Sequence, residues 1–201
     1  GCAVIAVDDG STDHTFSVLS NLDVTVIQHE VNRGKGRALR SGFRHVLEQG
    51  EWAHAATIDA DGQHDPDEIP SLMKSAADQQ ADLVIGARRF ERSKMPFKRW
   101  IANKISSFVI SKLIRTDIQD IQSGYRIYSR RFLEAIFSEI SAAGFEIETE
   151  LLLLALRRKF VVRETPIQSI YSRRANELSN WKTFQDSARI AKIIFRHTFR
   201  N

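Results

Sequence analysis

The sequence predicts an α/β protein with a mostly parallel central sheet and helices on both of its faces, a three-layer sandwich. Short apolar runs alternate with helix-forming segments over residues 1–87, a pattern typical of parallel strands joined by crossover helices. Aspartates follow two of these runs, and ligands of such sheets bind beyond the carboxyl ends of the strands. A length of 201 residues with 42% hydrophobic residues is enough for one domain with a substantial core.

Residues 1–87 are expected to contain four strands with three helices between them. The expected strands are short apolar runs, bounded mostly by turn residues, at Val4–Val7, Val24–Ile27, Ala53–Ile58 and Leu83–Ile85. Capping residues and helix breakers bound the helices. The first is capped at Ser11–Asp13 and runs through about Leu19, the second covers Gly34–Leu47, and the third opens at Asp65-Pro66-Asp67-Glu68.

Residues 88–201 are expected to form the second half of the same domain, because no repeat or linker-like stretch interrupts them. Apolar and basic residues alternate with helical spacing over residues 97–114, which predicts a basic amphipathic helix. We then expect a strand at Ser123–Tyr128 and a helix at Glu146–Arg158. Two extended segments follow, Lys159–Arg163 and Pro166–Tyr171, and a last basic helix covers residues 182–199.

Charge is segregated along the chain, although the net charge is only +4. The net charge is −8 over residues 1–87, +8 over 88–115, −4 over 116–156 and +8 over 157–201. The acidic half could hold a cation, and the basic segments could hold an anion or lie on an anionic membrane. Charge alone would also allow nucleic-acid binding, but no nucleic-acid motif is present and we expect none.

Several classes of protein are excluded by composition. The single cysteine, Cys2, excludes a disulfide framework and a cysteine-based zinc site. No apolar run approaches the roughly 18 residues of a membrane-spanning helix, and no signal peptide is visible. The first residue is not Met and the chain opens directly on an apolar run, so we expect a fragment or a processed chain.

Asp59 and Asp61 follow an expected strand, one residue apart. At a strand end both carboxylates can turn toward one cation, and hard oxygen ligands suit Mg²⁺ or Mn²⁺. A solvated acidic loop in front of a helix cap explains the same spacing, and both interpretations stay open. An EF-hand is a poor fit because His64 stands at the sixth position, where that loop needs Gly. The segment Asn32–Gly36 could bring Lys35 and backbone amides to a phosphate at a helix start, although it is not a P-loop.

Five motifs occur in a specific order. They are Val7–Asp13, Asn32–Gly36, Asp59–His64, Gly86–Arg88 and Gln122–Arg126. In this order they resemble family 2 glycosyltransferases, and most of all the branch of dolichol-phosphate mannosyltransferases and related polyprenyl-phosphate sugar transferases. The resemblance covers residues 3 to 195, about the whole chain. The same family usually begins with another strand and a Pro-x-x-Asn-Glu turn, which this chain lacks, so we expect an incomplete donor pocket.

The resemblance implies a GT-A fold, a nucleotide-sugar donor of the GDP-mannose or UDP-glucose type, a divalent Mg²⁺ or Mn²⁺ and inversion at the anomeric carbon. Residues 1–87 would bind the donor and residues 88–201 the acceptor. Donor contacts are implied for Asp8, Asp9, Arg33, Lys35 and Asp59. The implied metal ligands are Asp61, Gln63 and Asp59, and the implied catalytic residues are Asp61, Asp59 and Arg88.

The resemblance also implies a lipid-phosphate acceptor, which is already anionic and needs cations more than a general base. The matching positions are Arg88, Arg99 and Asn103, with Ser123, Arg126 and Arg174 as further candidates. An acceptor hydroxyl would instead need a carboxylate base, for which Glu146, Glu148 and Glu150 are candidates, although a structural use fits all three.

Three functions therefore remain open from the sequence. The first is hexose transfer to a polyprenyl or dolichyl phosphate by a peripheral enzyme on the cytoplasmic face of a membrane. The second keeps the donor site but uses a glycan or another hydroxyl acceptor. The third is a truncated, non-catalytic binding module, which the absent first strand–helix unit would favour.

Overall fold

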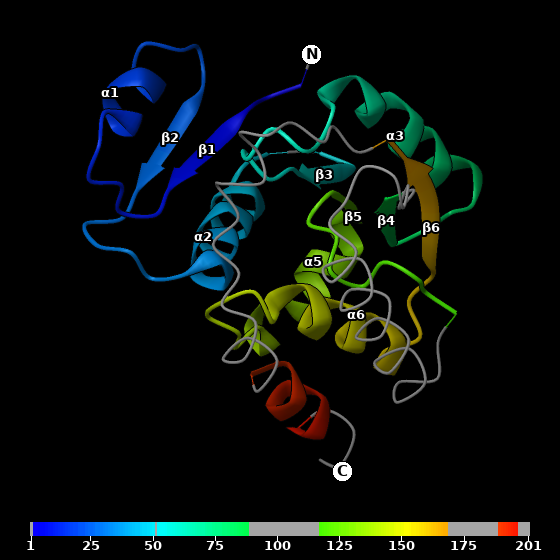
Figure 1. The fold of residues 1–201 in the computed structure, drawn as a ribbon. Coiled ribbons are helices and arrows are strands. Elements are labelled where there is room, and N and C mark those ends of the chain that lie inside the picture. Colours follow the sequence, from blue (N-terminus) through cyan, green and yellow to red (C-terminus); the bar gives the residue numbers. More distant parts are fainter. Residues whose placement is uncertain (1, 51, 89–116, 169–188, 197–201) are drawn as a thin grey trace, which may run out of the picture.

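A computed structural model describes residues 2–50, 52–88, 117–168 and 189–196 (Figure 1). Its strands are β1 (Ile5–Asp8), β2 (Thr25–Gln28), β3 (His54–Thr57), β4 (Leu83–Arg88), β5 (Arg126–Ser129) and β6 (Val162–Ile167). Its helices are α1 (Thr15–Leu19), α2 (Lys35–Glu48), α3 (Ile69–Asp78), α5 (Arg130–Ile136) and α6 (Ile147–Arg157), with short 3₁₀ turns η1 (Pro66–Glu68) and η2 (Phe137–Glu139). Residues 189–196 are also helical.

The α/β class expected from the sequence is confirmed, and the strands of the described residues form two sheets. β1 and β2 pair in parallel, while the larger sheet has the order β3-β5-β4-β6. This larger sheet is mixed, because β4 and β6 run parallel whereas β5 runs antiparallel to both β3 and β4. As a consequence, the carboxyl ends of β3 and β4 lie on either side of the start of β5.

Helices cover both faces of the larger sheet, which gives the three expected layers (Figure 1). Neighbouring residues of a strand point to opposite faces. Leu83 and Ile85 therefore join the larger core with helices α2, α5 and α6, whereas Val84 joins a smaller core with α3. Helix α6 is deeply enclosed, since residues 147–155 are all buried. Polar side chains on this helix must find partners inside the protein.

The expected helices agree with the structure within a few residues. Asp65 accepts a hydrogen bond from the Asp67 amide at 3.0 Å, and Pro66 opens the 3₁₀ turn that leads into α3. The expected helix over 97–114 lies outside the described residues, and only residues 189–196 of the expected last helix are described. Within the described residues, no helix has the length and apolar character that crossing a membrane would require.

Asp82 fastens the sheet at the end opposite the expected ligand-binding edge. Its buried carboxylate accepts from the Ser129 hydroxyl at 2.9 Å, from the Arg131 guanidinium at 2.7 Å and from the Val161 amide at 3.0 Å. Burial by itself would raise the pKa of Asp82, but these donors together hold that pKa below its usual value. The contacts tie the start of β4 to the start of α5 and to the segment before β6.

Candidate active site

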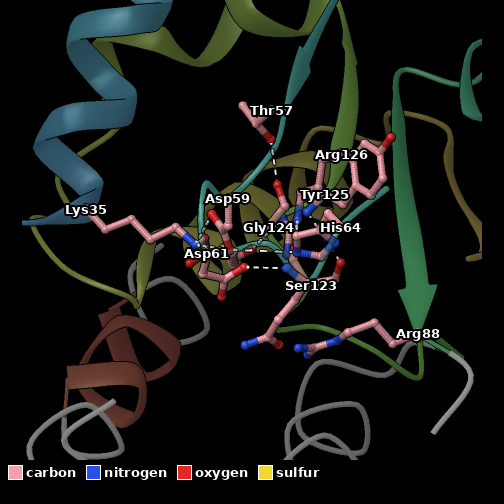
Figure 2. A network of polar contacts seen from close by, with 12 residues as sticks. Lys35, Thr57, Asp59, Asp61, His64, Arg88, Ser123, Gly124, Tyr125 and Arg126 are labelled. Atoms are coloured by element: carbon pink, nitrogen blue, oxygen red, sulfur yellow. Dashed lines mark hydrogen bonds and ion pairs between the residues drawn. The ribbon is translucent and has the colours of Figure 1, made fainter. Parts of the chain in front are cut away.

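The motifs at the carboxyl ends of β3 and β4 meet at one edge of the larger sheet (Figure 2). Thr57 of β3 and Ile85 of β4 both pair with Arg126 of β5. Asp59 and Asp61 lie just past the end of β3, and Arg88 is the last residue of β4. The antiparallel β5 thus brings Ser123 and Gly124, which precede it, to the same edge as these side chains.

Lys35 stands at the centre of the acidic part of this edge. Its Nζ atom lies 2.8 Å from Asp59 Oδ1 and 2.9 Å from Asp59 Oδ2. The same Nζ atom lies 2.7 Å from Glu148 Oε1 on helix α6. Burial would lower the pKa of Lys35, but the two carboxylates outweigh it and raise that pKa well above its usual value. The ammonium group is therefore charged throughout the physiological pH range.

The carboxylate of Asp59 is held from two sides. Burial would raise its pKa, yet the charge and hydrogen bond of Lys35 keep the pKa of Asp59 below its usual value. On another side Gly124 packs so closely that a Cβ atom there would lie 2.5 Å from Asp59 Oδ2. Thr57 steadies this contact by donating from its hydroxyl to the Gly124 carbonyl at 2.8 Å. Any side chain at position 124 would displace Asp59.

Asp61 begins a tight turn that leads to Gln63 and His64. Its Oδ1 atom accepts from the Gln63 amide at 3.0 Å, and both Gln63 and His64 are buried. His64 packs edge-on against Tyr125 with 5.1 Å between ring centroids, and its Nδ1 atom finds no hydrogen-bond partner among the described residues. Burial lowers the pKa of His64, so its imidazole is neutral at neutral pH.

The donor atoms at this edge fit a hard divalent cation. Asp61, Asp59 and Gln63 offer carboxylate and amide oxygens, the atoms that Mg²⁺ and Mn²⁺ prefer. In the described part of the chain, no cluster of three or more acidic, histidine or cysteine side chains forms a complete protein cage. A Mg²⁺ ion usually needs only one or two protein carboxylates when phosphate oxygens complete its shell. These residues could thus hold a cation together with a diphosphate.

A second polar cluster lies at the end of β1. Asp9 accepts from the backbone amides of Arg33 at 3.0 Å and Gly34 at 2.7 Å, so it fastens the loop that leads into α2. His29 lies between Asp9 and Ser41, with Nδ1 2.6 Å from Asp9 Oδ1 and Nε2 2.9 Å from Ser41 Oγ. The sequence offered no signal for His29, because its partners stand 20 and 12 residues away.

Asp8 differs from Asp9 in keeping one oxygen without a donor. Asp8 is 3% exposed, and its Oδ1 atom accepts from the Ser11 amide at 2.9 Å. Its buried Oδ2 atom has no hydrogen-bond partner among the described residues. Buried carboxylate oxygens are nearly always hydrogen-bonded. An N–H or O–H group of a ligand would satisfy this one, which agrees with the donor contact expected for Asp8.

Arg88 is held in a fixed direction by a residue that sequence reasoning missed. Its Nε and Nη2 atoms donate to Asp120 Oδ2 at 2.7 Å and Oδ1 at 2.9 Å, a two-pronged ion pair. Asp120 is 2% exposed, and its own amide donates to Glu164 Oε1 at 2.8 Å. Asp120 stands three residues before Ser123, and only the folded chain brings it to the end of β4.

The remaining acceptor candidates divide into two groups. Arg126 is completely buried and donates to the carbonyls of Ser123, Ile121 and Glu148 at 2.6–2.8 Å. Ser123 is also 0% exposed. Neither side chain reaches the surface, where a lipid phosphate would bind. The other candidates, Arg99, Asn103 and Arg174, lie outside the described residues.

The three glutamates of the 146–150 segment all have structural partners. Glu146 accepts from the Ala143 and Gly144 amides, each at 3.1 Å. Glu148 pairs with Lys35, as described above. Glu150 accepts from the Ser141 amide at 3.0 Å and the Ala142 amide at 2.8 Å. These contacts agree with the structural use that the sequence suggested for them.

Solved structures with the same arrangement belong to GT-A glycosyltransferases. Glucosyl-3-phosphoglycerate synthase from Mycobacterium tuberculosis, in complex with phosphoglyceric acid, superposes with a TM-score of 0.72 at 19% identity. The match covers 97% of this chain and 68% of that one. The same enzyme in complex with Mn²⁺, UDP-glucose and phosphoglyceric acid gives a TM-score of 0.70. The fold is therefore the GT-A fold that the resemblance implied.

The family model described as Glycosyl transferase family 2 matches residues 2–137, and the chain belongs to this family of transferase enzymes. A UDP-N-acetylglucosamine–dolichyl-phosphate N-acetylglucosaminyltransferase of Methanococcus voltae is 31% identical over 189 residues, covering 84% of this chain and 75% of that protein. An undecaprenyl-phosphate mannosyltransferase of Micrococcus luteus is 31% identical over 173 residues, covering 82% of this chain and 70% of that protein. Both relatives belong to the branch that the five motifs indicated.

Proposed function

We propose that this glycosyltransferase moves a hexose or a related sugar from a nucleotide sugar to a polyprenyl or dolichyl phosphate, with the help of Mg²⁺ or Mn²⁺. The observation that carries the proposal is the meeting of two kinds of group at one sheet edge. Carboxylates that suit a metal-bound diphosphate follow β3, and an arginine that suits a phosphate acceptor ends β4. The names of the two relatives described above support the lipid-phosphate acceptor.

On the donor side, Asp61 would be the principal metal ligand, with Gln63 and Asp59 beside it. A divalent cation there would neutralise the charge that develops on the departing nucleoside diphosphate. Asp8 supplies a buried oxygen for an N–H or O–H group of the nucleoside. Asp9 accepts hydrogen bonds from the backbone amides of Arg33 and Gly34, and so fixes the loop that would lie beside the nucleotide.

On the acceptor side, Arg88 would bind the lipid phosphate. The two-pronged ion pair with Asp120 fixes the direction of the Arg88 guanidinium, which reduces the conformational entropy that the side chain loses on binding. A phosphate oxygen is already anionic and can attack without a general base. A hydroxyl acceptor would instead need a carboxylate base, and the candidates for it, Glu146, Glu148 and Glu150, all contact other groups of the protein. A lipid acceptor also implies work at a membrane surface.

The test is consumption of nucleotide sugars by the full-length protein, with Mn²⁺ or Mg²⁺ and with or without a polyprenyl phosphate. We expect turnover that requires both the metal and the lipid phosphate. Asp61→Ala should lower this turnover at least about 100-fold, because it removes a group that stabilises charge in the transition state. Asp67→Ala is the matched control, since this exposed acid lies six residues further along the chain, in the 3₁₀ turn η1.

Other outcomes would change the proposal in defined ways. Metal-dependent donor hydrolysis that ignores the lipid phosphate would move the acceptor to a glycan or another hydroxyl. Wild-type turnover by Asp61→Ala would disprove the metal site. An absence of donor use under every condition would indicate a non-catalytic binding module.

A further inference from the structure

Glu148 contacts the expected donor site through the side chain of Lys35. The Nζ atom of Lys35 lies 2.7 Å from Glu148 Oε1 and 2.8 Å from Asp59 Oδ1. These three residues come from α6, from the start of α2 and from the loop after β3. Lys35 therefore connects the interior of the protein to the sheet edge where the donor would bind.

Glu148 is a costly residue to bury without a partner. Its side chain is only 4% exposed, on a helix whose residues 147–155 are all buried. Removing one member of a buried ion pair leaves an uncompensated charge and is strongly destabilising. The neighbouring Glu146 and Glu150 bind backbone amides of residues 141–144 instead. Of these three glutamates, only Glu148 reaches Lys35, and this makes its contact specific.

The pairing has a consequence for Asp59. Both Asp59 oxygens lie within 2.9 Å of Lys35 Nζ, and Gly124 closes another side of the carboxylate. The position of Asp59 thus depends on where Lys35 lies, and Glu148 anchors Lys35 from inside. Together the three side chains carry one positive and two negative charges, a net charge of about −1 next to Asp61.

We propose that Glu148 is a positioning residue of the donor site, which acts by holding Lys35 against Asp59. The inference rests on the proposed function, because it assumes that a divalent cation carries the diphosphate of the donor at this edge. Groups that orient the ligands of a metal typically change its affinity about 10- to 100-fold. Glu148 would thus influence the binding of a cation that it does not touch.

The test measures binding of Mn²⁺ by electron paramagnetic resonance, in the presence of UDP or GDP, so that the readout does not depend on turnover. We expect Glu148→Gln to weaken Mn²⁺ binding about tenfold. Glu150→Gln is the matched control, because it alters a buried carboxylate two residues away that faces backbone amides. It should lower the melting temperature and leave Mn²⁺ affinity within about twofold of the wild type.

A double variant separates positioning from charge. Lys35→Met combined with Glu148→Gln keeps the net charge of the three side chains at about −1 and removes both members of the Lys35–Glu148 ion pair together. Only Asp59, whose side chain is 31% exposed, then lacks its charged partner, so the variant should fold even if Glu148→Gln alone does not. If Glu148 acts by holding Lys35, the Mn²⁺ affinity of this variant remains at least about tenfold weaker than that of the wild type, because Asp59 has lost its partner. Wild-type affinity in the double variant would show that only charge matters and would overturn the proposal.

The remaining outcomes also decide the question. Unchanged Mn²⁺ affinity in Glu148→Gln overturns the proposal and leaves the proposed function intact. An equal loss in Glu150→Gln would show a general packing effect and would also overturn it. Failure of the wild-type protein to bind Mn²⁺ with either nucleotide contradicts the metal-dependent donor site itself, and with it the role of Glu148.

Discussion

Replacing Gly124 by Ala should disable the donor site without unfolding the protein. The new Cβ atom would lie 2.5 Å from Asp59 Oδ2, 2.7 Å from Oδ1 and 2.8 Å from Cγ. A carbon and an oxygen atom normally approach no closer than about 3.3 Å, so the carboxylate must retreat by nearly 1 Å. Such a shift lengthens its contacts with Lys35, which are 2.8 and 2.9 Å long.

The expected cost follows from this displacement. A misplacement of about 1 Å in a site can reduce the rate about 100-fold, which corresponds to roughly 2.7 kcal/mol of transition-state stabilisation. The backbone of Gly124 is not in the left-handed region, so the alanine adds no backbone strain. We therefore expect a loss in kcat/KM for the nucleotide sugar with only a small change in the free energy of unfolding.

The assay compares kcat/KM and urea unfolding for Gly124→Ala and Gly50→Ala. Gly50 is the matched control, because a Cβ atom there meets nothing within 4 Å. Its variant should keep activity within about twofold of the wild type. Full activity in Gly124→Ala would refute the reasoning, since it would mean that the position of Asp59 does not matter. An equal loss of activity and of stability would point to general misfolding instead.

Two further predictions concern stability, and both use urea unfolding. Arg126→Leu should lower the free energy of unfolding by about 3 kcal/mol or more, because three buried carbonyls lose their donor; a loss under about 1 kcal/mol would contradict this structural role. The pKa of Asp82 is depressed in the folded state, so its contribution is present above the unfolded pKa of about 3.9 and disappears as the pH falls through the lower folded pKa. Asp82→Asn should therefore lower the free energy of unfolding at neutral pH and make that free energy fall less steeply between about pH 5 and pH 2. A pH profile like that of the wild type would rule out Asp82 as a source of the acid-induced loss of stability.

The local pattern of the sequence was enough to predict most of the elements. Apolar runs that end at turn residues located β1, β3 and β4, and the helix signals located α2 and α6 within a few residues. These predictions succeed because strand and helix periodicity is a property of neighbouring residues. The five ordered motifs also identified the family, which its family model confirms over residues 2–137.

The direction of β5 could not be predicted in the same way. Parallel and antiparallel strands have similar local sequences, and pairing is decided by where the chain returns after a long connection. In the structure β5 runs against β3 and β4. This brings Gly124 onto Asp59, a contact between residues 65 positions apart that no local pattern reveals.

The sequence by itself determined the family and predicted which residues would carry the chemistry, because candidate metal-binding carboxylates and phosphate-binding arginines are recognisable by type and by order. Only the tertiary structure decided how each is used. It showed that Arg126 supports backbone carbonyls, that Asp120 directs Arg88, and that Glu148 reaches Lys35. Burial and partners decide these roles, and both depend on the distances between residues that folding alone brings together.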